Sequence, residues 1–165
     1  MSKGPITPHY GTVERKIHTI VENMDGVEYL FMNWAQANEK IDHVEGPTVI
    51  YILPPSGALD FDYARVKDYP ESQIAFVAST EFDFEGEEND NIIEQMKRLC
   101  MRFVKSLNES GLFEPIEGRL LYRVLYDYFD QNVVGIVITP QLIEEEGVSI
   151  CEGETRSEDE FNGNE

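Results

Sequence analysis

The sequence has few cysteines, few basic residues and no long hydrophobic run, and each shortage excludes a class of protein. Its two cysteines, Cys100 and Cys151, are too few for a disulfide framework and lack the paired spacing of a zinc site. No segment approaches the ~18 consecutive apolar residues of a membrane helix. Residues 1–10, MSKGPITPHY, contain no apolar stretch typical of a secretory signal. We therefore expect a protein of a reducing, cytosolic compartment.

Motifs for phosphate binding and nucleophilic catalysis are also absent from the sequence. It contains neither GxGxxG nor GxxxxGK[ST], and Ser56, in PPSGA, lacks the flanking glycines of a nucleophile elbow. The histidines, His9, His18 and His43, show no metal-ligand spacing. Any two carboxylates could form a glycosidase-like acid pair, but no pair is singled out. The sequence thus names no catalytic residue, and we expect neither enzymatic activity nor a bound cofactor.

Acidic residues are the one clear excess. The 165 residues include 32 Asp and Glu against 13 Lys and Arg, a net charge of −19. They concentrate in residues 81–90, EFDFEGEEND, and in the tail from Glu144 to Glu165. Such an excess repels nucleic-acid phosphates and anionic membranes. Three interpretations stay open: a solubilising surface, a surface facing something negative that must not bind, and a mimic of the DNA backbone. Four carboxylates are also candidate calcium ligands, although without EF-hand spacing: Asp83, Glu85, Glu87 and Glu88.

The composition predicts one globular domain, residues 12–151. Hydrophobic residues make up 41% of the chain and aromatic residues 11%, enough for a sizeable core. Residues 1–11 contain Pro5, Pro8 and Gly11 and are expected to form an extended arm. Residues 152–165 are acidic and polar, and we expect them to be disordered.

Two helices are predicted from apolar periodicity. The first is capped by Thr12, carries an apolar stripe from Val13 to Met24 and ends at Gly26. The second spans residues 92–109, with Asn91 as its N-cap and Gly111 as its stop. Its apolar stripe contains Ile92, Met96, Leu99, Phe103 and Leu107, widened by Ile93, Cys100 and Val104.

The opposite side of the second helix is basic. It carries Lys97, Arg98, Arg102 and Lys105. This face is either a binding patch or a solvated face that forms ion pairs with the acidic block. The candidate electrostatic residues are Glu85, Glu87, Glu88, Arg98 and Arg102.

The remaining patterns predict an α+β fold, with helices on one side of a mostly antiparallel sheet. Residues 47–57 read as a strand buried on both faces, residues 59–68 as an exposed strand and residues 72–80 as a third. Residues 27–41 are ambiguous, because Tyr29 to Met32 could be a strand before a helix that begins at Asn33.

Residues 119–139 predict a hairpin that turns at residues 130–132. Pro140 argues for an edge or a break after it. Both hairpin faces are largely apolar, which favours a subunit contact unless helices of the same chain cover both. The candidate interface residues are Tyr122, Tyr126 and Tyr128 on one face and Leu121, Leu125 and Phe129 on the other.

Several segments together carry a family resemblance: PTVIYILPPSG, SQIAFVAST, the more specific ENDNIIEQMKRL and YDYFDQNVVGI, and GVSIC. Over roughly residues 12–151 the chain resembles neck and tail-completion proteins of tailed bacteriophages, especially crAss-like phages of Bacteroides. The resemblance implies a tail-terminator-like α+β subunit that forms a ring between portal and tail. It implies a virion protein assembled in the host cytoplasm, with copies of itself and other neck, portal or tail proteins as partners and no catalytic residues.

Two other classes of function remain open. One is an acidic anti-defence or regulatory protein that mimics DNA. The other is a small-ligand or peptide-binding module that uses the strand edge near Pro140.

Overall fold

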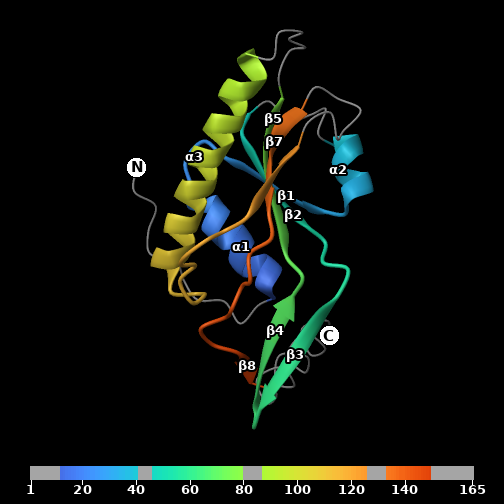
Figure 1. Cartoon of the computed structure of the whole chain (residues 1–165). Helices are drawn as coiled ribbons and strands as arrows, with labels where there is room; N and C mark the ends of the chain where they lie inside the picture. Colours follow the sequence, from blue (N-terminus) through green and yellow to red (C-terminus); the bar gives the residue numbers. More distant parts are fainter. Residues whose placement is uncertain (1–11, 41–45, 80–86, 126–132, 150–165) are drawn as a thin grey trace, which may run out of the picture.

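The computed structural model describes residues 12–40, 46–79, 87–125 and 133–149. They form an α+β fold around a five-stranded, mostly antiparallel sheet, with a separate three-stranded sheet below it (Figure 1). The predicted arm, the acidic tail beyond Ser149 and the hairpin turn lie outside the described residues. The elements are α1 (Val13–Glu22), β1 (Glu28–Met32), α2 (Trp34–Lys40), β2 (Thr48–Ile52), β3 (Gly57–Asp62), β4 (Arg65–Pro70), β5 (Gln73–Ser79), α3 (Glu87–Ser110), β6 (Tyr122–Leu125), β7 (Val133–Ile138) and β8 (Val148–Ser149).

The main sheet, ordered β1-β2-β5-β7-β6, separates two hydrophobic clusters. Helices α1 and α3 pack on one face, as predicted, and α2 lies on the other (Figure 1). Alternate residues of one strand supply both clusters: Val49 and Tyr51 of β2 face α1 and α3, whereas Ile50 and Ile52 belong to the α2 side. Strand β2 is buried along its whole length, which confirms that prediction.

The apolar stripe of α3 is buried as the sequence indicates. Leu99 is 4% exposed and Phe103 is fully buried against the sheet, where its ring meets Phe76 edge-on at 5.5 Å between centroids. The predicted start of this helix is wrong: α3 begins at Glu87, so Asn91 lies inside the helix and is not its N-cap. Its end is confirmed, since Gly111 takes a φ of 71°, the left-handed conformation that favours glycine.

Residues 27–40 form both of the elements that the sequence left open. Strand β1 pairs in parallel with β2, and α2 connects them. Asn33 and Gln36 form a reciprocal cap at the start of α2: Gln36 N–H donates to Asn33 Oδ1 at 2.8 Å, and Asn33 N–H donates to Gln36 Oε1 at 3.2 Å. The sheet is therefore antiparallel except for the β1–β2 pair.

Residues 57–70 form a hairpin and not the single exposed strand predicted for 59–68. Strands β3 and β4 pair antiparallel from Gly57↔Pro70 to Asp62↔Arg65, and Tyr63 and Ala64 make the turn. Tyr63 takes a φ of 52°, a conformation that the turn imposes on a residue poorly suited to it. The apolar residues of LDFDYARVKD fall at odd positions up to Tyr63 and at even positions from Ala64, and this change of phase marks the turn that the prediction of one strand overlooked.

Strand β7 requires a glycine at its centre. A Cβ at Gly135 would lie 1.9 Å from the carbonyl oxygen of Phe76 on the adjacent β5, so no other residue fits without moving the strands apart. The strand ends at Ile138, two residues before Pro140, which marks a break and not a sheet edge, because β6 covers the other side of β7.

A buried ion pair joins α1 to the segment between β7 and β8. Lys16 Nζ lies 2.7 Å from Glu144 Oε1, and their side chains are 5% and 3% exposed. Glu144 Oε2 also accepts a 3.1 Å hydrogen bond from the backbone N–H of Asp68 in β4. Burial, followed by the charge of Glu144, raises the pKa of the Asp68 carboxyl. The sequence suggested that Glu144 begins a solvated acidic tail, and this expectation is wrong because Glu144 is buried.

Removing one partner of this buried pair will destabilise the fold more than removing both charges. We expect Lys16→Met or Glu144→Gln alone to lower the free energy of unfolding by about 3–5 kcal/mol, because a buried charge loses its partner. The double variant should recover most of this loss, since the amide oxygen of the substituted side chain can still accept the Asp68 N–H. Urea unfolding of the wild type, the two single variants and the double variant measures the coupling energy between Lys16 and Glu144.

Lys105→Met is the matched control: its pair with Glu109 spans 4.0 Å and is exposed, so removing it should cost about 0–1 kcal/mol. Additive single effects would contradict the expectation.

Adjacent residues of α3 should respond oppositely to substitution. Leu99→Asp places an unpaired charge in the core and should abolish cooperative unfolding, because the cost is on the order of the whole stability. Arg98→Ala changes an exposed side chain and should leave the melting temperature nearly unchanged. Circular dichroism melts check both, and similar melting of the two variants would mean that the helix faces the other way.

Candidate functional site

The β3–β4 hairpin is the first of two open surfaces. It projects from the main sheet at the lower end of the molecule (Figure 1), and every residue of β3 is exposed. Three large apolar side chains lie along it: Leu59 is 61% exposed, Phe61 64% and Tyr63 100%. Side chains of this size are usually buried, so their grouping on one projecting element indicates an interaction surface.

The two faces of the hairpin differ in character. The strand register places Leu59 and Phe61 on one face, with Phe61 opposite Val66 of β4. The other face carries Asp60 opposite Lys67 and Asp62 opposite Arg65. Strand β3 is also an edge of its sheet, since no other described strand pairs with its outer side.

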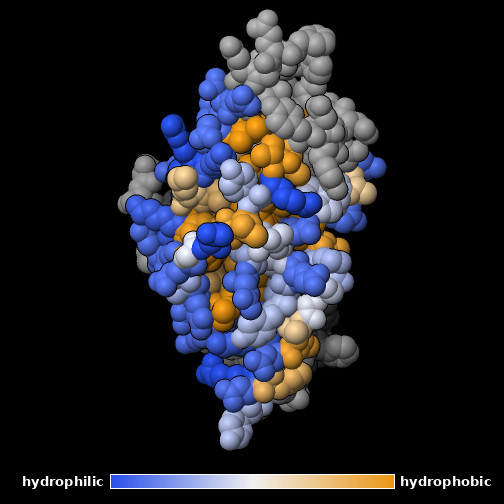
Figure 2. Space-filling model, viewed as in Figure 1, coloured by the Kyte–Doolittle hydropathy of each residue, from blue (hydrophilic) through white to orange (hydrophobic). Residues whose placement is uncertain are grey.

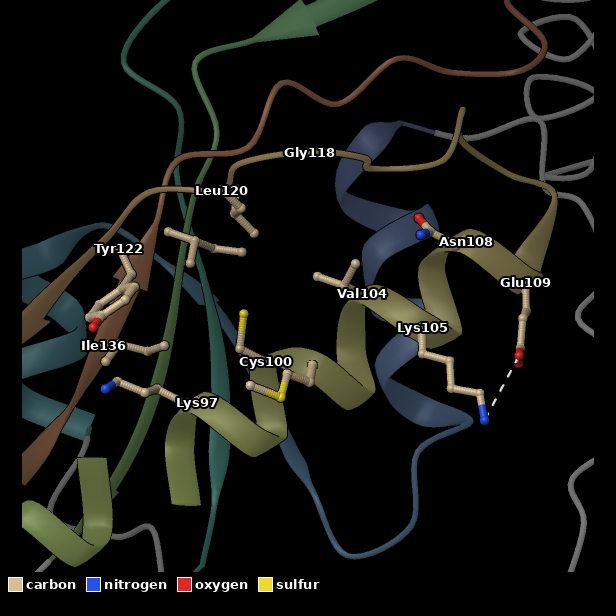
Figure 3. Close-up of a pocket in the computed structure, with 12 residues that line it drawn as sticks. Lys97, Cys100, Val104, Lys105, Asn108, Glu109, Gly118, Leu120, Tyr122 and Ile136 are labelled. Carbon is tan, nitrogen blue, oxygen red and sulfur yellow. Dashed lines mark ion pairs between the residues drawn. The ribbon is translucent and has the colours of Figure 1, made fainter. Parts of the chain in front are cut away.

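The second open surface is a groove between α3 and β6, called here the α3–β6 groove. Its volume is about 650 Å³, within the ~300–1,000 Å³ typical of ligand pockets. Figure 3 shows Cys100 and Val104 of α3 facing Leu120, Tyr122 and Ile136 across it. Figure 2 shows hydrophobic surface in the α3–β6 groove and again on the hairpin. The lining residues are Lys97, Cys100, Met101, Val104, Lys105, Asn108, Glu109, Gly118, Leu120, Tyr122, Ile136 and Ile138.

The groove has an apolar floor and a partly cationic rim. Lys97 Nζ lies 5.0 Å from the centre of the Tyr122 ring and donates a 2.9 Å hydrogen bond to Glu94. This hydrogen bond, helped by Tyr122, raises the pKa of the Lys97 ammonium, so Lys97 is charged at neutral pH. Burial raises the pKa of the Cys100 thiol to about 11, which keeps it neutral. The groove therefore has no activated nucleophile at Cys100.

The polar side chain of Asn108 is engaged within the chain. Its Nδ2 donates to the carbonyl of Ile116 at 3.2 Å, and its Oδ1 accepts from the Ile116 N–H at 2.8 Å. These bonds fix the segment that follows α3 and hold Leu120 on the groove wall. The groove thus combines an apolar wall with rim lysines that already pair with Glu94 and Glu109, and it offers no catalytic constellation among the described residues.

The candidate interface residues of the hairpin at 119–139 are placed differently from one another. Tyr122 lines the groove and is 49% exposed, and Leu121 is 69% exposed. Leu125 is 4% exposed and packs in the α2-side cluster, which leaves little of it for a neighbouring subunit. Tyr126, Tyr128 and Phe129 lie outside the described residues, so the interface stays a prediction.

The basic face of α3 is exposed. Arg98 and Arg102 both reach solvent, and Arg102 donates a 3.1 Å hydrogen bond to the carbonyl of Asp25. Lys97 and Lys105 pair with glutamates of the same helix, Glu94 and Glu109. Glu85 lies outside the described residues, and Glu87 and Glu88 stand at the start of α3. The predicted contacts between this face and the acidic block stay untested.

A smaller hollow, about 400 Å³, lies beside Pro140. It is lined by Ser72 and Gln73 at the start of β5 and by Gln141 after β7. Ser72 and Gln73 already have partners: the Ser72 hydroxyl lies 3.0 Å from the Tyr51 hydroxyl, and Gln73 Oε1 accepts from Trp34 Nε1 at 3.0 Å. Among the described residues, Glu71 is the one charged side chain that lines this hollow.

No three His, Cys, Asp or Glu side chains gather as a metal site within the described ranges, which leave out residues 80–86 of the acidic block. His18 lies on α1, where its ring stacks on Tyr29 at 4.4 Å and its Nε2 lies 2.9 Å from Glu22. His9 and His43 fall outside these ranges. In the same part of the chain, no helix has the length and hydropathy to cross a membrane.

Sequence reasoning missed both open surfaces. The hairpin tip was hidden because Tyr63-Ala64 is not a recognisable turn pair. The α3–β6 groove lies between α3 and residues 118–122. The sequence of neither segment alone indicates a groove there. The sequence did contain one signal of an exposed strand with two different faces. It is the alternation of Leu59 and Phe61 with Asp60 and Asp62.

Comparison with protein-family models, with curated proteins and with solved structures finds no match to this chain.

Proposed function

We propose that this protein is a structural subunit of a phage virion, and that copies of it form a ring in the head–tail connector or at the tail end. The observation that carries the proposal is the presence of two unlike surfaces on one small domain that no described residue covers: the projecting hairpin and the α3–β6 groove. A ring needs two different faces on each subunit, because its contacts are heterologous. The family resemblance of residues 12–151 supports the same assignment.

The charge of the chain also supports a ring through which DNA passes. A net charge of −19 makes the surface repel phosphates, so a lumen lined by this protein would not retain DNA. Strand β3 adds Asp60 and Asp62 to the exposed carboxylates. The long basic helix face does not reverse this balance, since its four cations are outnumbered across the chain.

The proposal places the protein in the virion, at the junction of head and tail. A copy tagged at its C-terminus, expressed during infection by the phage that encodes it, should be labelled by gold at one site per particle in negative-stain images. A deletion should yield filled heads without tails, because the connector is missing. The same tag on an unrelated cytoplasmic protein is the control. A protein that is absent from purified particles would overturn the proposal, and binding to a host DNA-binding protein would then favour a DNA mimic.

A further inference from the structure

The β3–β4 hairpin contributes nothing to the apolar cores of the main sheet. Among the described residues, neither hydrophobic cluster contains a residue of β3, β4 or β8. The connection from β2 to β3 contains Pro54 and Pro55, which lack the N–H groups that a strand ladder needs, so the two sheets do not merge there. Because apolar burial is the main force that packs elements together, other contacts must hold the hairpin in place.

The hydrogen bonds that hold the hairpin lie on the outer side of β4. Glu144 Oε2 accepts the Asp68 N–H at 3.1 Å, and Glu144 Oε1 lies 2.7 Å from Lys16 Nζ. Closer to the turn, β4 pairs with β8 over two residue pairs. The segment that carries Glu144 is joined to the rest of the domain, since the Glu145 N–H donates to the carbonyl of Leu112 at 3.1 Å. The hairpin is thus fastened to the domain by few bonds.

Gly147 brings the same segment into direct backbone contact with β4. A Cβ at this position would lie 2.5 Å from the carbonyl oxygen of Val66, closer than such atoms approach in proteins. A Cβ at Gly46, by contrast, would meet nothing within 4 Å. Position 147 therefore accepts only glycine while the hairpin lies against this segment, and a larger residue there would push the hairpin away.

Glu144 both attracts and repels Asp68. Its Oε2 binds the Asp68 N–H, whereas burial, followed by the charge of Glu144, raises the pKa of the Asp68 carboxyl. Ionised Asp68 therefore disfavours the position in which the hairpin lies against Glu144. Glu144 itself is 2% exposed, and its desolvation also opposes this position. The hairpin is thus held by a contact whose electrostatic effects partly cancel.

We infer that the β3–β4 hairpin is a hinged arm: it swings away from Glu144 and β8 as a paired unit while the main sheet stays folded, with Glu144 as the catch that holds it closed. The arm ends at Ser56 and Glu71, whose backbones share a 2.9 Å hydrogen bond. The main sheet resumes at Ser72, whose hydroxyl lies 3.0 Å from that of Tyr51. The inference goes beyond the proposed virion function and does not depend on it, because it concerns the free chain. In a ring subunit, such an arm would change direction without unfolding of the core.

Two neighbouring amides distinguish swinging of the arm from unfolding. The Asp68 N–H points away from β3, so the Val66 N–H points the same way, toward β8, and the Lys67 N–H points toward β3. Opening of a paired arm exposes the Val66 N–H but leaves the Lys67 N–H bonded to β3. In the wild-type chain, hydrogen exchange measured by NMR and corrected for intrinsic rates should therefore be faster at Val66 than at Lys67, and faster than at Phe76 in the main sheet.

Two double variants that differ only at position 144 test the catch. Lys16→Met with Glu144→Gln keeps an acceptor for the Asp68 N–H, whereas Lys16→Met with Glu144→Leu removes it, and neither leaves an unpaired buried charge. Exchange at Val66 should be roughly tenfold or more faster in the protein with Glu144→Leu, because the closed arm loses one hydrogen bond from a buried N–H. Exchange at Phe76 should be the same in both.

Two single variants shift the arm in opposite directions. Gly147→Ala should open it and speed exchange at Val66, since the added methyl group takes the place of the Val66 carbonyl; Gly46→Ala is the matched control and should have no effect there. Asp68→Asn keeps the N–H and removes the repulsion from Glu144, so exchange at Val66 should slow. Circular dichroism checks that every variant is folded.

A common exchange rate at Val66, Lys67 and Phe76 would overturn the inference, because the hairpin would then open only when the whole domain unfolds. Equal rates at Val66 and Lys67, both faster than at Phe76, would overturn it too, since the hairpin would melt and not swing. Equal rates at Val66 in the two double variants, or a Gly147→Ala protein that behaves like Gly46→Ala, would likewise contradict it. None of these outcomes bears on the virion, because gold labelling at the neck decides the proposed function separately.

Discussion

The Lys16–Glu144 ion pair, buried between α1 and the segment after β7, is the constraint on which the arrangement of the two sheets depends. Glu144 binds Lys16 with one oxygen and the Asp68 N–H of β4 with the other. It thus holds the hairpin sheet against the helix that packs on the main sheet. The Lys16 ammonium lies 6.0 Å from the centre of the Phe113 ring. Phe113 and Glu144 also form an isolated antiparallel β-bridge through their backbones. Such a pair adds little net stability, but neither partner can leave without the other becoming an unpaired buried charge.

This constraint explains why the β3–β4 hairpin can project and yet be ordered. The Asp68 hydrogen bond fixes the middle of β4, and β8 pairs with Arg65 and Val66 directly beside the turn, so the domain holds the tip as well. Phe61 and Tyr63 are exposed on a hairpin that is fixed at both places. A loose loop with the same residues would lose more conformational entropy on binding, which is why an ordered arm suits an assembly contact.

The groove arises from the same packing that builds the core. Helix α3 turns Leu99 and Phe103 toward the sheet, while Cys100 and Val104 point along the gap to β6. Strand β6 is short and at the sheet edge, so no further strand covers this gap among the described residues.

The sequence by itself determined the elements whose periodicity is long and regular. The α3 stripe from Ile92 to Leu107, the buried strand β2 and the cap at Thr12 follow from apolar spacing and local hydrogen bonding, which need no distant residue. The hairpin turn at Tyr63 was missed because its backbone conformation contradicts the preference of tyrosine and is imposed by the pairing of β3 with β4. Only the tertiary structure decided that Glu144 is buried, since its partner Lys16 is 128 residues away. Likewise, the groove exists only where α3 meets residues 118–122, because a cavity belongs to the space between segments and to neither segment alone.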